Sequence, residues 1–203
     1  MNRKTLIVMK VLVWSVCLAP ALWIAWGATT NTLGADPTAA ITFATGLATL
    51  RLLTVSLAIT PLRQLFPRLS WLIKFRRLLG LFAFFYATLH LLTWVALYCG
   101  FDVGTMTSDV VKRRFITVGV AAWLLLLPLA ATSTNWAIRK MGGKNWNRLH
   151  KLVYVAAGCG IVHYWWQVKT GVLTPLPMTV VITLLLVARP VLALVKRLKA
   201  RAA

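Results

Sequence analysis

The chain has 203 residues, of which 60% are hydrophobic and only 13% are charged, and its mean hydropathy is +0.77. A soluble domain is nearer half apolar and about a quarter charged, so this composition excludes an ordinary soluble enzyme and indicates an integral membrane protein. The formal net charge is +20, but Lys and Arg lie at alternate ends of apolar stretches and not along one soluble face, which argues against a nucleic-acid partner.

Six apolar stretches are long enough to cross a hydrocarbon core of ~30 Å as helices. They cover residues 11–28, 40–61, 78–100, 115–132, 149–168 and 174–195. The first lacks a clear small-residue cleavage site, so we interpret it as a span and not as a signal peptide. We therefore predict an all-α bundle of six transmembrane helices that forms a single domain over residues 1–203. No internal repeat is evident in the sequence.

The basic residues predict the orientation of this bundle. Most of them lie near the N-terminus, between the second and third spans, around the join of the fourth and fifth spans, and at the end of the chain. The opposite loops hold all three acidic residues together with four basic ones: Asp36, Asp102, Asp109, Lys112, Arg113, Arg114 and Lys169. Because cytoplasmic loops carry the excess of Lys and Arg, both termini are expected in the cytoplasm.

The chain has three histidines, His90, His150 and His163, and all lie inside or at the rim of predicted spans. Ionisable side chains at membrane depth are costly and usually functional, and neutral imidazole is a common ligand of metals and of haem iron. At 1.5 Å per residue, His90 and His163 both lie roughly 20 Å from the cytoplasmic ends of their helices. This matched depth predicts that the two rings ligate one haem from facing helices.

His150 has no histidine at its own depth, since Arg76 and Arg77 occupy that level of the third span. It binds a second haem, or serves another cofactor or a quinone, or is an interfacial residue without a ligand role. Its spacing of 13 residues from His163 corresponds to about 140° of rotation on an ideal helix. Without a distortion at Gly158 and Gly160, the two rings serve different pockets.

Three arginines are candidate cofactor-binding residues. Arg51 lies in the middle of the second span, where it either snorkels over a long reach to the interface or is the partner of a haem propionate or another anionic cofactor group. Arg76 and Arg77 either anchor the cytoplasmic boundary or bind propionates, a flavin phosphate or lipid headgroups. The sequence shows no nucleophile–base set and no carboxylate pair, so no catalytic residue is predicted. The three cysteines show no paired spacing, and we interpret them as small buried hydrophobes.

Several segments together carry a family resemblance that covers nearly the whole chain. They are LGADP (33–37), ITPL (59–62), IKFRRLLGL (73–81), YATLH (86–90), WNRLH (146–150), KLVY (151–154) and IVHY (161–164). In these segments the chain resembles the MsrQ family (formerly YedZ), the haem-binding membrane subunits of bacterial methionine-sulfoxide reductase systems. More distantly, it is similar to the ferric-reductase-like transmembrane domain of the NADPH oxidases.

The resemblance implies a role as an electron-transfer subunit in the bacterial inner membrane. Members of the family take electrons from the quinone pool and pass them through haem b to MsrP, a periplasmic molybdopterin enzyme that repairs oxidised periplasmic proteins and forms a heterodimer with its membrane partner. Catalysis is then expected in the partner. FMN is implied by the family alone. Proteins of the wider group carry two pairs of histidines and bind two haems. In this chain Arg76 or Arg77 stands at the inner position of the third span, where those proteins have the fourth histidine. The resemblance therefore implies one haem or two.

Two other functions fit the same sequence. A stand-alone reductase of external metal chelates or oxygen would use the same haem without a partner enzyme. A non-redox membrane protein would pack its histidines or bind a transported ion with them. A visible spectrum and a requirement for the partner separate these three classes.

Overall fold

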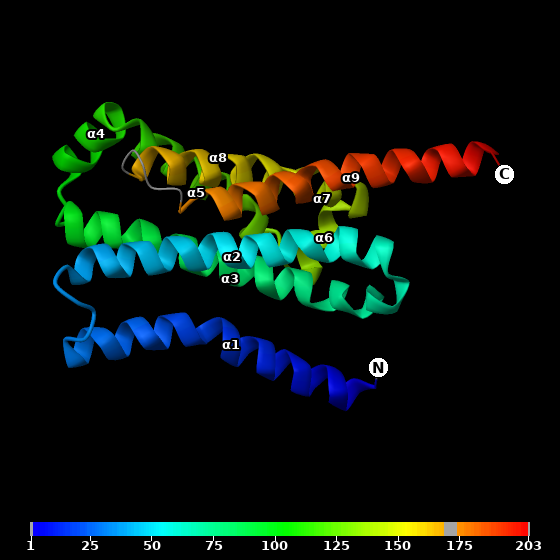
Figure 1. Cartoon of the computed structure of the whole chain (residues 1–203), viewed down its shortest axis with the longest axis horizontal. Helices are drawn as coiled ribbons and strands as arrows, with labels where there is room; N and C mark the ends of the chain where they lie inside the picture. Colours follow the sequence, from blue (N-terminus) through cyan, green and yellow to red (C-terminus); the bar gives the residue numbers. More distant parts are fainter. Residues whose placement is uncertain (1, 169–173, 203) are drawn as a thin grey trace.

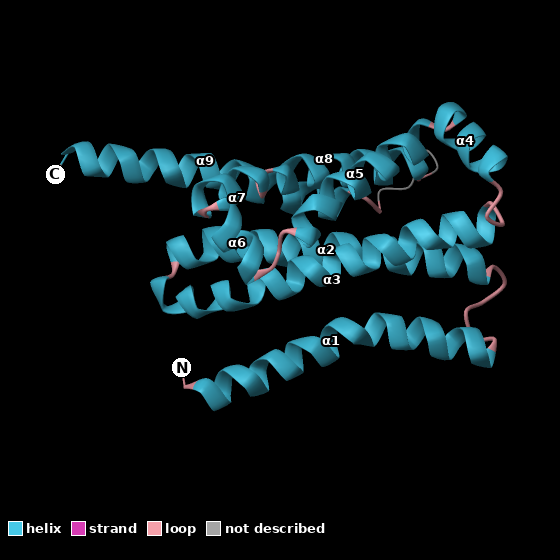
Figure 2. Ribbon diagram, turned by 180° about the vertical axis from the view of Figure 1, so that it is seen from behind, coloured by secondary structure: helices cyan, strands magenta, loops and turns pink. Residues whose placement is uncertain are grey.

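The computed structural model describes residues 2–168 and 174–202, and the regular structure in these residues is entirely helical (Figure 2). Lys169 lies outside the described residues. η1 is a 3₁₀ helix and η2 is a π-helix that continues α3. In chain order the elements are α1 (Arg3–Thr30), α2 (Pro37–Leu65), η1 (Pro67–Leu72), α3 (Ile73–Thr93), η2 (Trp94–Tyr98), α4 (Val103–Lys112), α5 (Arg114–Ala131), α6 (Asn135–Met141), α7 (Gly143–Leu149), α8 (Leu152–Gln167) and α9 (Leu176–Ala202).

Five helical segments are long and apolar enough to cross a membrane, which makes this a multi-pass membrane protein. They are Arg3–Thr30, Pro37–Leu65, Pro67–Tyr98, Arg114–Ala131 and Leu176–Val195. The predicted span at residues 149–168 corresponds to α8, whose 16 residues rise only about 24 Å. It is therefore shorter than a standard crossing, and the count of six spans stays a prediction.

The long helices run roughly side by side, and both chain termini lie at the same end of the bundle (Figure 1). The opposite end holds the α1–α2 connection and the short helix α4, so all three aspartates gather there. Asp102 caps the start of α4, where hydrogen bonds from the Thr105 side chain and backbone hold the pKa of Asp102 below its usual value. The charge segregation predicted from the loops is thus present in three dimensions, while the side that faces the cytoplasm stays a prediction.

Two helix pairs form the centre of the bundle, α2 packed on α3 and α5 packed on α8. Their contact is close because small side chains lie at the interfaces: Ala83, Ala156 and Ala157 are at most 1% exposed. Small residues let helix backbones approach in a lipid environment, where packing replaces the hydrophobic effect as the driving force. α9 closes this core through Ile182, and α1 lies on the outer side of α2 and α3.

A tyrosine from α3 is inserted into the backbone ladder of α1. The Tyr86 hydroxyl donates to the carbonyl oxygen of Cys17 (2.6 Å) and accepts from the backbone N–H of Ala21 (3.1 Å). These two backbone groups are four residues apart and would bond each other in an unbroken helix. Pro20, which has no N–H, lies between them, and a side chain inserted at a proline is a recognised cause of helix bending. Tyr86 therefore attaches the outermost helix to the core.

We predict that Tyr86→Phe loosens α1 from the bundle. The change removes a hydroxyl that bonds the buried carbonyl of Cys17 and the half-buried N–H of Ala21, so the free energy of unfolding should fall by about 1–3 kcal/mol. The measurement is unfolding of the purified protein in detergent. Tyr98→Phe, which removes the same atom from a ring that is 52% exposed, is the matched control. Equal stability of the two variants would contradict the assignment.

Candidate metal centre

Two of the three histidines meet inside the bundle. The ring centroids of His90 (α3) and His163 (α8) are 5.8 Å apart, and the ring planes lie at 87° to each other. Both rings line a cavity of about 260 Å³ between α2, α3, α5 and α8. The rest of its lining is mainly apolar or aromatic and includes Phe43, Leu50 and Trp123. The cavity therefore presents two imidazoles in an apolar setting.

The hydrogen bonds of these rings fix which nitrogen faces the cavity. His90 Nδ1 donates to the carbonyl oxygen of Thr42 (2.9 Å), and His163 Nδ1 donates to the carbonyl oxygen of Phe115 (2.7 Å). A carbonyl oxygen can only accept, so each proton must be on Nδ1 and each Nε2 keeps a free lone pair. Histidines that bind metals usually donate their other N–H to a carbonyl or a carboxylate. Both rings are thus neutral, and each has one nitrogen lone pair that a metal could accept.

A glycine makes room for each ring. A Cβ on Gly46 would lie 3.1 Å from His90 Cε1, and one on Gly119 would lie 2.7 Å from His163 Nδ1. Each glycine lies four residues after the carbonyl that its histidine uses. The same device therefore occurs twice, with 48 residues from carbonyl to histidine in both cases. The α5–α8 copy follows the α2–α3 copy at an offset of 73 residues (His163 against His90, Gly119 against Gly46). The structure reveals an internal repeat that the sequence alone does not show.

The distance between the rings suits a metal held between them. Two metal–nitrogen bonds of about 2 Å, plus about 1 Å from each nitrogen to its ring centre, add to roughly 6 Å. Within residues 2–168 and 174–202, no group of three or more His, Cys, Asp or Glu side chains could hold a metal ion. Two axial imidazoles therefore need a group that supplies the remaining ligands itself, as a porphyrin does. The residues present fit haem.

His150 lies elsewhere, at the end of the bundle that holds the chain termini. It follows α7 in the turn before α8 and stacks on Trp146 with ring centroids 3.7 Å apart. Its Nε2 is 3.1 Å from the Thr132 hydroxyl, which already donates to the carbonyl oxygen of Pro128, so Nε2 carries the proton and Nδ1 is free. α8 passes through Gly158 and Gly160 as a continuous α-helix. The structure thus does not bring His150 to the cavity of His163.

The predicted arginines are distributed between two environments. Arg76 and Arg77 lie close enough to His150 for their charges to act on it, and Arg77 also donates to the Asn135 side chain (2.7 Å). At the offset of 73 residues, His150 corresponds to Arg77 in the first copy of the repeat. Arg51 is exposed and is not among the residues that line the cavity. Its role in cofactor binding stays a prediction that the geometry does not support.

Two further arginines, Arg189 and Arg113, have contacts or positions that the sequence did not predict. Arg189 lies inside the sixth predicted span, donates to Tyr154 Oη and to the carbonyl oxygen of Leu57 (2.6 Å), and lies over the Tyr154 ring. Its position within a span was a signal that could have been noticed. Arg113, at the other end of the bundle, lines the cavity of His90 and His163. It was assigned only as a loop charge, because no sequence pattern indicates that the α4–α5 connection closes this cavity.

Comparison with known proteins identifies a matching family and several similar proteins. The model of the family "Ferric reductase like transmembrane component" matches residues 45–161, a segment that contains His90 and His150 and ends two residues before His163. Proteins named "protein-methionine-sulfoxide reductase heme-binding subunit MsrQ" in several bacteria are similar to this chain. The Ralstonia nicotianae protein is 48% identical over 83% of this chain and 76% of its own length. The Polaromonas naphthalenivorans protein is 50% identical (78% and 72%), and the Rhodospirillum rubrum protein is 44% identical (95% and 92%).

Proposed function

Since this chain belongs to the MsrQ family, the haem-binding subunits of protein-methionine-sulfoxide reductases, with a ferric-reductase-like membrane domain, we propose that it is the electron-transfer subunit of such a system. It takes electrons from the quinone pool and delivers them to a periplasmic MsrP-type molybdopterin enzyme, with haem b as its redox group. Residues 1–203 form one domain of six spans in the bacterial inner membrane, with both termini in the cytoplasm.

The observation that carries this proposal is the pair of free Nε2 atoms in one apolar cavity. Nδ1 of His90 and Nδ1 of His163 each donate to a backbone carbonyl oxygen, so each ring keeps the Nε2 lone pair with which it would hold a haem iron. A bound haem supplies a one-electron couple between ferric and ferrous iron. The chain itself holds the two rings, keeps water from the metal with the apolar lining, and fixes the neutral state of both imidazoles.

A second site is proposed at the other end of the bundle, formed by His150, Arg76 and Arg77. The free Nδ1 of His150 and the two guanidinium groups suit either a second haem with a non-histidine sixth position or another anionic cofactor such as FMN. A quinone is a further occupant of the same region. The two arginines favour an anionic ligand, because guanidinium groups bind carboxylates and phosphates in a planar, two-point geometry.

The ligand assignment predicts how the visible spectrum responds to histidine substitution. His90→Ala and His163→Ala should each remove or strongly reduce the Soret band of the purified protein, because either change deletes one axial bond. His150→Ala is the internal control, since His150 lies outside the cavity. It should leave the band that depends on His90 and His163. An unaltered Soret band in both His90→Ala and His163→Ala would exclude this site.

The glycine beside His163 gives a prediction at a position that cannot ligate. Gly119→Ala places a methyl group 2.7 Å from His163 Nδ1, so the ring must move off the Phe115 carbonyl. Changes in the outer shell of a metal site typically lower affinity by roughly tenfold or more, and haem content should fall accordingly in a pyridine-haemochrome assay. Gly158→Ala, in open space within α8, should retain full haem content. Equal haem content in the two variants would argue against the proposed geometry.

The proposed role also predicts what oxidises the reduced protein. The dithionite-reduced protein, freed of excess reductant under anaerobic conditions, should be reoxidised only when an MsrP-type enzyme from the same organism and methionine sulfoxide are both present. Stopped-flow absorbance of the haem band is the measurement. Ferric citrate alone is the control for a stand-alone metal reductase. Equally fast oxidation by ferric citrate would favour that alternative function and contradict the carrier role.

A further inference from the structure

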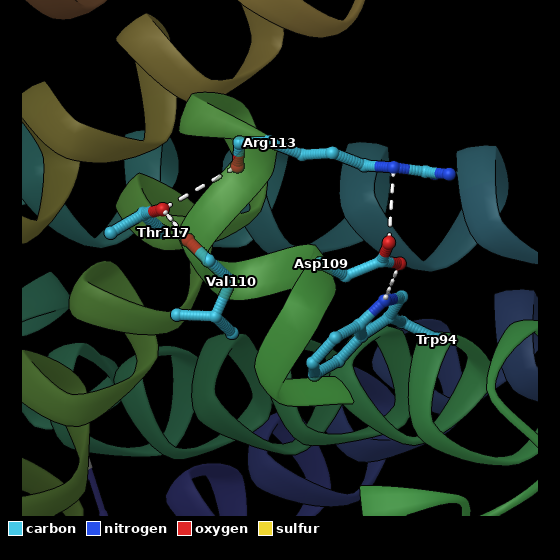
Figure 3. Close-up of polar contacts among 5 residues, drawn as sticks. All are labelled: Trp94, Asp109, Val110, Arg113 and Thr117. Atoms are coloured by element: carbon cyan, nitrogen blue, oxygen red, sulfur yellow. Dashed lines mark hydrogen bonds and ion pairs between the residues drawn. The ribbon is translucent and has the colours of Figure 1, made fainter. Parts of the chain in front are cut away.

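Arg113 occupies a fixed joint at the mouth of the cavity. It is the single residue between α4 and α5 and has an extended backbone. Its N–H donates to the carbonyl oxygen of Asp109 (2.9 Å), and its own carbonyl oxygen accepts from Ile116 N–H (2.9 Å). The Thr117 hydroxyl bonds both Val110 and Arg113 across the same joint (Figure 3). The starting point of the Arg113 side chain is therefore held in place.

The side chain of Arg113 is positioned by a half-buried carboxylate, that of Asp109. Its Nε lies 3.1 Å from Asp109 Oδ1, and Asp109 Oδ2 accepts from Trp94 Nε1 at 3.3 Å (Figure 3). The Asp109 side chain is only 15% exposed, whereas that of Arg113 is 57% exposed. Trp94 belongs to the π-helical turn that follows His90 by four residues, and such turns are frequent at functional sites. Asp109 and Trp94 thus act as positioning residues for the guanidinium.

Most of the hydrogen-bonding capacity of this guanidinium is unused. A guanidinium has five N–H donors, and only Nε has a partner in the described part of the chain. Arg113 lines the same cavity as His90 and His163, and among the lining residues in residues 2–168 and 174–202 it is the one with a permanent charge. Phe115, whose carbonyl holds His163, lies two residues further on. The cavity thus offers two axial nitrogens inside and one anion-binding fork at its mouth.

We propose that the two terminal amino groups of Arg113 bind a propionate carboxylate of the haem held by His90 and His163. The inference rests on the proposed function. It assigns the propionate edge to the end of the bundle that carries α4. It also gives the Asp109–Arg113 pair a role beyond stability, since an ion pair made by a largely exposed arginine contributes little to stability by itself.

Two ligands that differ only in their carboxylates test this contact. Full-length apoprotein, produced without haem and purified in detergent, is titrated with iron protoporphyrin IX and with its dimethyl ester. A charge-assisted hydrogen bond to a carboxylate is a strong one, so the wild-type protein should bind the acid roughly tenfold or more tightly than the ester. Arg113→Gln should bind the two with nearly equal affinity, because it lacks the charge that distinguishes them. Arg113→Lys should recover part of the difference.

The control is Arg114→Gln, which removes the same charge from the next residue, an exposed one that does not line the cavity. It should discriminate between acid and ester as the wild type does. Ester binding by Arg113→Gln at the wild-type level shows that this variant is folded and supports the proposal.

Undiminished discrimination in Arg113→Gln, or an equal loss of both ligands, overturns the proposal and leaves the proposed function intact. A wild-type protein that binds neither porphyrin overturns both.

Discussion

One hydrogen bond per histidine determines what this bundle can do. Each ring donates from Nδ1 to a carbonyl oxygen on the adjacent helix, at 2.9 Å for His90 and 2.7 Å for His163. This carbonyl belongs to a helix and has two lone pairs, so it can accept from the histidine without losing its hydrogen bond within the helix. Because a glycine lies four residues further on, the ring can approach this carbonyl. The bond makes the ring neutral, orients it, and leaves Nε2 directed at the cavity.

The repeated geometry explains both the symmetry and the asymmetry of the molecule. The helix pairs α2–α3 and α5–α8 each contribute one carbonyl, one glycine and one histidine at the same spacing. At the other end of the bundle the same offset relates His150 to Arg77, so the two ends differ chemically. One end offers two imidazoles and the carboxylate-fixed Arg113. The other offers one imidazole and a group of arginines, with every aspartate of the chain at the opposite end.

The sequence predicts the helical membrane bundle and the meeting of His90 with His163, because apolar length, charge segregation and helical rise translate directly into depth. For a helix without distortion at Gly158 and Gly160, it also predicts that His150 and His163 do not share a face. It does not predict that α8 has only 16 residues. Nor does it predict that Arg51 is exposed and does not line the cavity, since this depends on which helix faces touch. Arg113 was missed for the same reason: its role arises from a joint between two helices, and the hydrogen bonds of that joint leave no pattern in composition or spacing.

We propose that His90 and His163 hold a haem iron in the cavity between the two helix pairs, and the electron-transfer role depends on this. Electron paramagnetic resonance of the oxidised, purified protein tests it most directly, because the signal of low-spin ferric haem reports both the axial ligands and the angle between their planes. With ring planes near 87°, the account predicts a low-spin signal of large anisotropy that disappears in His90→Ala and in His163→Ala. A low-spin signal that persists unchanged in both variants, or a purely high-spin wild-type protein, would contradict it.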